Sequence, residues 1–156
     1  MSIERARAHL ARWGLDARIR ELEASSATVA LAAEALGTEP ERIAKTLSFM
    51  TADGPILVVA AGDARVDNHK YKAKFGTKAK MLSQEEVEPL IGHAVGGVCP
   101  FGVERGVRVY LDESLRRFGT VFPAAGTAAS AIELTLPELE LASEAVEWVD
   151  VTSIPE

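Results

Sequence analysis

The sequence has 156 residues, 47% of them hydrophobic and 26% charged, with a formal net charge of −6. These values are ordinary for a soluble globular domain and argue against a disordered or fibrous chain. Cys99 is the only cysteine, so an internal disulfide is excluded, and the longest apolar run, residues 55–61, is too short to cross a bilayer. We therefore expect one domain over residues 1–156, with no membrane span, in a reducing compartment such as the cytoplasm.

Apolar spacing and capping residues predict helices in the first third of the chain. One helix over residues 3–13 is expected to dock on the domain, and a second covers residues 28–36. Thr38 and Glu41 form a capping-box pattern, which predicts a short helix that runs into Lys45.

A pair of strands is expected next, over residues 45–50 and 55–61, joined by a turn at residues 53–55. The second strand is apolar at every position, so it should lie in the centre of the sheet. Asp67 is a suitable N-cap for a following helix over residues 68–75.

Short helices and strands are expected to alternate in the rest of the chain. The predicted helices run from Ser83 to about 91 and from Thr135 to about 143, and the predicted strands cover 107–111, 120–122, 131–134 and 146–151. This irregular order predicts an α+β fold, with a mixed central sheet or partly open barrel surrounded by short helices.

The six lysines are distributed very unevenly. Five of them form a cationic stripe within residues 70–80, a stretch that contains no acid, namely Lys70, Lys72, Lys74, Lys78 and Lys80. An acidic protein with one concentrated cationic stripe is expected to bind an anionic partner there, although charge runs are commonly just solvated helix faces.

Lys45 stands alone in the apolar, strand-like run IAKTLSFM. Burying an unpaired ammonium is costly, so a lysine in this setting is a candidate functional group. The alternatives are that Lys45 extends its stem along apolar neighbours to the protein surface, or that it pairs with a carboxylate.

The segment GGVCPFG, residues 96–102, cannot form a regular helix or central strand because of its three glycines and its proline. The backbone N–H groups of Gly96, Gly97 and Gly102 could converge on a ligand and stabilise an oxyanion. The alternative is a tight connection between elements. Cys99 lies in the same loop, but we expect a buried filler rather than a nucleophile.

A second irregular stretch, PAAGTAAS at residues 123–130, offers small polar groups and little bulk. Gly126, Thr127 and Ser130 are its candidate substrate-binding residues, together with Phe101 of the glycine-rich loop. The competing interpretation is a plain loop between strands.

Sites for metals and nucleotide cofactors are not predicted. His9, His69 and His93 have no ligand-like spacing with one another or with Cys99. The sequence contains neither a phosphate-binding glycine loop nor a dinucleotide fingerprint after a strand.

Five strings, in order along residues 28–143, resemble the YbaK/EbsC family, the editing domain associated with prolyl-tRNA synthetase. They are AKTLSF around Lys45, GDARVDNHK at 62–70, EEV at 85–87, IGHAVGGVCPFG at 91–102 and AAGTAASAIELTLPEL at 124–139.

This resemblance implies a free-standing, metal-independent hydrolase that removes a wrong amino acid from tRNA, commonly tRNA for proline. The family lysine corresponds to Lys45 and the family glycine loop to Gly96, Gly97 and Gly102. The stripe would then hold the acceptor end, and prolyl-tRNA synthetase is a candidate partner. Some members carry a polar residue near positions 129–131, where this chain has Ala, Ser and Ala. Which amino acid is removed therefore stays open, as does the oligomeric state.

Other functions remain open at this point. The same features would suit a non-catalytic module that binds the tRNA end or a synthetase. A protein acting on a small metabolite, with the lysines merely solvated, is a third interpretation.

Overall fold

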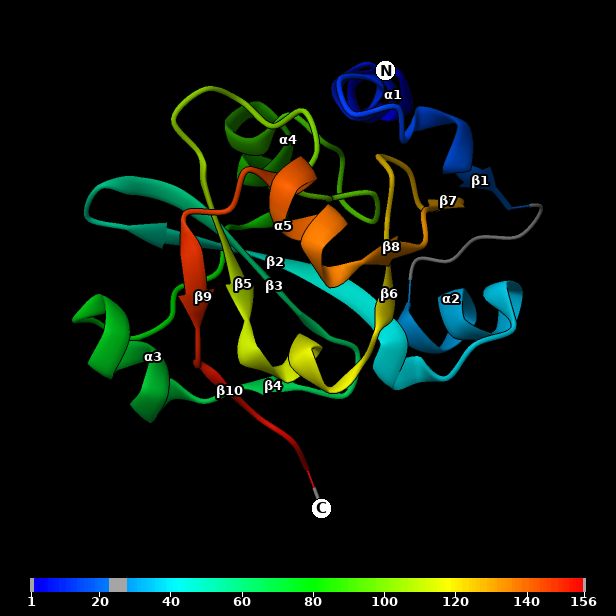
Figure 1. Ribbon diagram of the computed structural model, residues 1–156. Coiled ribbons are helices and arrows are strands. Elements are labelled where there is room, and N and C mark those ends of the chain that lie inside the picture. The colour runs from blue at the N-terminus through cyan, green and yellow to red at the C-terminus, as the bar shows by residue number, and fades with distance from the viewer. Residues whose placement is uncertain (1, 23–27, 156) are drawn as a thin grey trace.

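The computed structural model describes residues 2–22 and 28–155 (Figure 1). The helices in these ranges are α1 (Ser2–Ala11), α2 (Val29–Leu36), α3 (Asn68–Phe75), α4 (Gln84–Ile91) and α5 (Leu136–Ser143), with 3-10 turns η1 (Asp16–Arg18), η2 (Pro40–Arg42) and η3 (Glu113–Arg117). The strands are β1 (Arg20–Glu21), β2 (Ile43–Thr51), β3 (Gly54–Ala61), β4 (Arg65–Val66), β5 (Arg108–Asp112), β6 (Thr120–Pro123), β7 (Ser130–Ala131), β8 (Leu134–Thr135), β9 (Glu147–Val149) and β10 (Thr152–Ser153).

Six of the strands form one curled sheet in the order β8-β6-β2-β3-β5-β9. β2 and β3 are an antiparallel hairpin, whereas β2–β6, β3–β5 and β5–β9 are parallel pairs. The predicted α+β fold with a mixed sheet is thus confirmed, and β3 lies in its centre, between β2 and β5.

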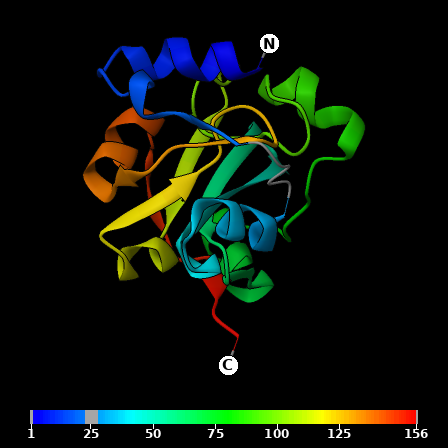
Figure 2. The same cartoon turned by 90° about the vertical axis from the view of Figure 1, so that its right-hand side faces the viewer.

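The central sheet has a packed layer on each face. Leu57 and Val59 of β3 belong to a large cluster that includes apolar residues of α1, α4 and α5. Ile56 and Val58 face the opposite way and pack with Tyr71 of α3. Figure 1 and, from the side, Figure 2 show the same arrangement, with α1 and α3 at opposite ends of the view. We call these the α4 face and the α3 face of the sheet.

Most predicted helix ends are confirmed by their caps. The Asp67 side chain accepts the Lys70 N–H at 3.1 Å, and α3 ends at Gly76 in the left-handed region. The capping boxes at Ser83 and Thr135 both form and open α4 and α5.

The predicted capping box at residues 38–41 is wrong. Thr38 and Glu41 form no capping box, because the turn at Pro40–Arg42 has Glu39 as its N-cap, and β2 already begins at Ile43. The pairing of Ile43 with Phe122 draws this segment into the sheet before a longer helix can form.

The predicted strand over residues 131–134 is instead two short strands, because its ends pair with different partners. β7 pairs with β1, and β8 pairs with β6. The predicted strand over residues 146–151 is likewise shorter, and β10 after it pairs with β4. No helix in the described ranges is long and apolar enough to span a bilayer.

Candidate functional site

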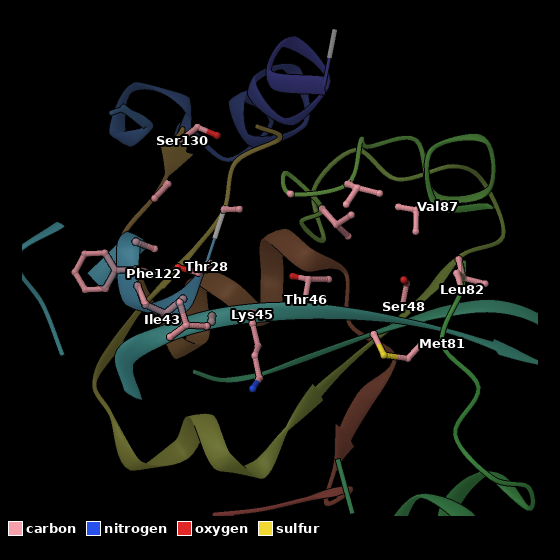
Figure 3. A pocket seen from close by; sticks show the side chains of 18 of the residues that line it. Thr28, Ile43, Lys45, Thr46, Ser48, Met81, Leu82, Val87, Phe122 and Ser130 are labelled. Atoms are coloured by element: carbon pink, nitrogen blue, oxygen red, sulfur yellow. The ribbon is translucent and has the colours of Figure 1, made fainter. Parts of the chain in front are cut away.

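A cavity of about 340 Å³ opens beside β2, between α2, α4, the loop that contains Gly96 and the short strand β7 (Figure 3). Its lining is largely aliphatic, with the hydroxyl-bearing residues Thr46, Ser48 and Ser130 among the side chains that contribute to it. The cavity is therefore an apolar recess with a few polar groups, which is the usual composition of a small-ligand site.

The cavity exists because one edge of β2 is only partly covered. β6 pairs with β2 at Ile43 and Ala44 alone. Further along, the Met50 N–H donates to the Lys80 carbonyl at 2.8 Å, and Leu82 N–H donates to the Ser48 carbonyl at 3.2 Å. A gap is left between the β6 pairing at Ile43–Ala44 and the contacts of Ser48 and Met50. Because backbone groups alternate in direction along a strand, the N–H and C=O groups of Thr46 point into this gap.

Thr46 and Ser48 project from β2 on the α4 face, into the cavity (Figure 3). Their antiparallel partners are Val59 and Leu57, whose side chains lie on the same face. The Thr46 hydroxyl is buried without a hydrogen-bond partner among the described residues. A buried hydroxyl without a partner is costly, so this group is suited to receive a polar atom of a ligand.

Lys45 lies on the opposite, α3 face, and its Nζ points away from Thr46 and Ser48 (Figure 3). The ammonium donates to the Ala64 carbonyl and, at 3.3 Å, to the Gly62 carbonyl. Burial lowers the pKa of the Lys45 ammonium. The stem of Lys45 contributes to the cavity wall, but the structure does not bring its charge together with the other site residues.

The turn that binds Lys45 is itself held by an ion pair. Asp63, between the two carbonyl acceptors, accepts two hydrogen bonds from Arg117, at 3.1 and 2.6 Å. These hydrogen bonds are the main reason that the pKa of Asp63 lies below its usual range.

The glycine-rich loop divides into a part at the cavity and a part in the core. Gly96 lines the cavity with a φ of 93°, and its N–H has no acceptor among the described residues. The Gly97 N–H instead donates to the Ala94 carbonyl at 3.0 Å. A Cβ at Gly97 would lie 2.5 Å from the Gly126 carbonyl oxygen, so this glycine permits close packing of two loops.

Gly102 and Phe101 lie away from the cavity, against α1. Phe101 is fully buried in the main core cluster. The Arg5 guanidinium donates to the Gly102 carbonyl at 2.6 Å, and a Cβ at Gly102 would lie 2.7 Å from the Arg5 carbonyl oxygen. Both residues thus attach the loop to α1.

Cys99 has the environment of a core residue, as expected from the sequence. It is fully buried, and burial raises the pKa of its thiol to about 12. The sequence spacing gave no sign that His93 would approach it, yet Cys99 Sγ lies 3.6 Å from His93 Nε2. Because burial also lowers the pKa of His93, this pair is poorly suited to form a thiolate.

Ser130, the first residue of β7, lines the cavity, but Gly126 and Thr127 of the preceding loop do not. The Ser130 hydroxyl accepts the Thr127 N–H and donates to the Thr127 carbonyl, both at 3.1 Å. Ser130 therefore braces the loop, and its hydroxyl is already engaged with Thr127.

The cationic stripe is split by the fold. Lys70 pairs with Asp150 at 3.1 Å, and Lys74 pairs with Glu147. The other three members, Lys72, Lys78 and Lys80, form no ion pair with any residue within 2–22 and 28–155. In the same part of the chain, no three His, Cys, Asp or Glu side chains are grouped closely enough to hold a metal ion.

Comparison with known proteins now identifies the family. A model of the aminoacyl-tRNA editing domain matches residues 23–141. The chain belongs to the aminoacyl-tRNA editing domain family. The family resemblance inferred from the sequence is thus confirmed.

This editing domain is similar to proteins of several kinds. The Bacillus subtilis protein YwhH, described as uncharacterized, is 52% identical over 152 residues, which is 97% of each chain. A proline–tRNA ligase of Bacillus cytotoxicus is 31% identical over 81 residues, which is 51% of this chain and 14% of the ligase. A solved structure of a proposed trans-editing enzyme for prolyl-tRNA synthetase superposes with a TM-score of 0.88 at 33% identity, over 97% of each chain.

Thr46 and Ser48 were not among the residues predicted for the site of this editing domain. The available signal was two hydroxyl residues at alternate positions of an otherwise apolar strand, which places both on one face. Lys45, directly before Thr46, is the more conspicuous feature of the sequence, but its ammonium lies on the α3 face rather than on the face of Thr46 and Ser48.

Proposed function

We propose that this chain hydrolyses the ester bond of mischarged aminoacyl-tRNA, with the aminoacyl group held in the cavity beside β2. The observation that carries the proposal is the buried Thr46 hydroxyl, which has no partner in the described structure and faces an apolar recess that the exposed Gly96 also lines. Membership of the editing-domain family supports the same reaction class.

In the proposed reaction, water attacks the ester carbonyl carbon and the bond to the ribose oxygen breaks. The products are the free amino acid and a tRNA whose terminal ribose oxygen has regained a proton. The Gly96 N–H would stabilise the oxyanion, as preorganised backbone donors do. An aminoacyl ester is already activated, so a protein nucleophile is not required, in agreement with the buried state of Cys99.

The cavity lining favours an uncharged aminoacyl side chain. Among the described residues, Lys45 is the only charged one that lines it, and its ammonium is bound to backbone carbonyls. A carboxylate or ammonium on the substrate would therefore lose water without gaining a counter-ion. The similarity to part of a proline–tRNA ligase supports tRNA for proline as the carrier.

We retain Lys45 in the proposed mechanism as a cation that reaches the ester or the adjacent phosphate. Rotation of its side chain around the open edge of β2 would be needed, because its Nζ lies on the α3 face. The flexible four-carbon stem of a lysine permits this movement, and the bonds to Gly62 and Ala64 would be exchanged for bonds to the substrate.

A second candidate function is a non-catalytic module that holds the charged tRNA end for a synthetase. One observation favours it: no His, Asp, Glu or Cys lines the cavity in the described part of the chain, so a general base is not provided there. Binding without turnover would use the same cavity.

A deacylation panel separates the two functions. Transfer RNA for proline, charged separately with alanine, cysteine, serine, proline and aspartate, is incubated with substoichiometric protein, and the acylated fraction is followed. We expect multiple turnovers with at least one small uncharged amino acid and no turnover with aspartate. Protection of the ester without any turnover would instead support the binding module.

A further inference from the structure

The inference below rests on the proposed function and concerns the route by which RNA reaches the cavity. The cationic stripe spans two surfaces rather than one. Lys70 and Lys74 belong to α3, on the α3 face, and pair with Asp150 and Glu147. The Lys70 ammonium also donates to the Thr152 carbonyl at 2.8 Å. These two lysines therefore have intramolecular partners and hold the C-terminal strands.

Lys78 and Lys80 lie beyond α3, on the segment that leads from Gly76 to α4. This segment reaches the edge of β2, where Met81 bridges to Phe49 and the Lys80 carbonyl accepts the Met50 N–H. Met81 and Leu82, directly after Lys80, line the cavity. Both lysines are exposed, and Lys80 directly precedes the cavity-lining Met81 in the chain.

Glu86 is an acidic neighbour of Lys80. Hydrogen bonds from Ser83 are the main reason that the pKa of Glu86 is lowered, and the charge of Lys80 is a smaller cause. Glu86 accepts the Ser83 N–H at 2.9 Å in the capping box of α4, so it is already engaged.

The opening of the cavity also carries exposed apolar side chains. Met81 is 57% exposed and Val95 is 54% exposed, and both contribute to the lining. Apolar groups that border a recess and stay in water commonly mark a surface for a partner. A polarisable thioether such as that of Met81 is well suited to contact the face of an aromatic ring.

We propose that Lys78, Lys80, Met81 and Val95 form the landing surface for the single-stranded 3′ end of the RNA. The two lysines contact phosphates of the terminal nucleotides, and Met81 with Val95 contacts the face of the terminal base. Proteins that bind single-stranded nucleic acid combine cations along the backbone with side chains against which the bases stack, most often aromatic ones. Here Met81 and Val95 would take the place of the aromatic side chains. Lys70 and Lys74 take no part in this contact.

Two charge-matched double variants test this division. The variants are Lys78→Gln/Lys80→Gln and Lys70→Gln/Lys74→Gln. Their binding to an acceptor-stem RNA hairpin with a 3′ CCA end and no attached amino acid is measured by fluorescence anisotropy at several salt concentrations. We expect the first variant to weaken binding roughly tenfold at low salt and to flatten the log–log salt slope by about 1.4, the value for two single-strand phosphate contacts. The second variant should change the slope by less than about 0.5.

The same titration is repeated with a hairpin that lacks the terminal adenosine. Wild-type protein should lose affinity for the shortened hairpin, whereas Met81→Ser should bind both hairpins equally weakly. Equal effects of the two lysine pairs, a larger effect of Lys70→Gln/Lys74→Gln, or no binding by the wild type would each overturn the proposal.

Because the hairpin carries no amino acid, there is no ester to hydrolyse, and these binding results do not depend on catalysis. If the two double variants differ in hairpin binding as expected but the protein does not deacylate tRNA, only the proposed function is contradicted. If the protein deacylates aminoacyl-tRNA but the two double variants bind the hairpin equally, only the proposed landing surface is contradicted.

Discussion

The two faces of strand β2 carry polar groups of opposite character. On the α4 face, the Thr46 hydroxyl is buried beside a cavity and has no partner within residues 2–22 and 28–155. On the α3 face, the Lys45 ammonium is bound to two backbone carbonyls. One face therefore has unused hydrogen-bonding capacity next to open space, and the other has its charge satisfied within the protein.

This comparison shows that an unusual residue and an available group are different signals. A lysine in an apolar strand is conspicuous in the sequence, but its present contacts stabilise the turn at residues 62–64. The hydroxyl of Thr46 is inconspicuous in the sequence, yet it lacks a partner among the described residues. Substitution of each residue tests whether the Lys45 ammonium, the Thr46 hydroxyl or both contribute to deacylation.

The largest effect is expected for Lys45→Met. The substitution removes two charge-assisted hydrogen bonds in a partly exposed setting, so we expect a loss of about 1–2 kcal/mol in unfolding free energy. That loss leaves a domain of ordinary stability almost fully folded at 25 °C. We nevertheless expect deacylation to fall about 10- to 150-fold, because a contact to the ester or phosphate is lost.

Paired measurements of thermal unfolding and single-turnover deacylation check this prediction, with Lys72→Met on the exposed side of α3 as the control. If the Lys45→Met protein is destabilised but deacylates at the wild-type rate, Lys45 only stabilises the turn at residues 62–64 and has no role in the reaction. The control should change neither quantity.

A second substitution, Gly102→Ala, should affect stability and spare activity. Gly102 has a φ of 71°, and an added Cβ would lie 2.7 Å from the Arg5 carbonyl oxygen. We expect a loss of about 2–3 kcal/mol, or roughly 5–10 °C in Tm, with deacylation per folded molecule unchanged. The matched control is Gly106→Ala, because Gly106 has a φ of 92° but open space around its Cα.

Gly106→Ala should cost only the strain of the left-handed backbone, about 1 kcal/mol. The difference in Tm between the two variants then measures the packing of the loop on α1. If the Gly102→Ala protein has a normal Tm but strongly reduced deacylation, Gly102 has a role in the active site.

The smallest effect is expected for Thr46→Val, which removes the unpartnered hydroxyl and keeps the shape. Stability should stay the same or rise by up to about 1 kcal/mol, since a buried polar group without a partner is lost. Deacylation should fall about 2- to 10-fold, the value of one neutral hydrogen bond to the substrate.

Thr38→Val provides the control. In the part of the chain that the structure describes, Thr38 also has a buried hydroxyl without a partner, but it does not line the cavity. It should resemble Thr46→Val in stability and the wild type in deacylation. A lower Tm for Thr46→Val would mean that its hydroxyl has a partner inside the protein.

The sequence was most informative about elements whose ends depend on local residues. The cap at Asp67 and the capping boxes at Ser83 and Thr135 formed as predicted, because each depends on side chains within three residues. The box at Thr38 failed because the nearby Ile43 pairs with Phe122, a contact from the other half of the chain.

The candidate site depends on such distant contacts to a greater degree. Gly96 and Gly102 stand in one short motif, but only the first reaches the cavity, because the second is held by Arg5 of α1. The split of the lysine stripe likewise follows from the position of Asp150 and Glu147 near α3, which local spacing does not encode.

The most direct test of the account is the position of a bound substrate analogue. A non-hydrolysable, amide-linked 3′-alanyl adenosine can be titrated into isotope-labelled protein, and nuclear Overhauser effects from its alanyl methyl group to protein methyl groups can be recorded. We predict contacts to the methyl groups of Thr46 and Val87, which line the cavity on the α4 face. Contacts to Leu47 and Val66, which pack on the α3 face, would contradict the account.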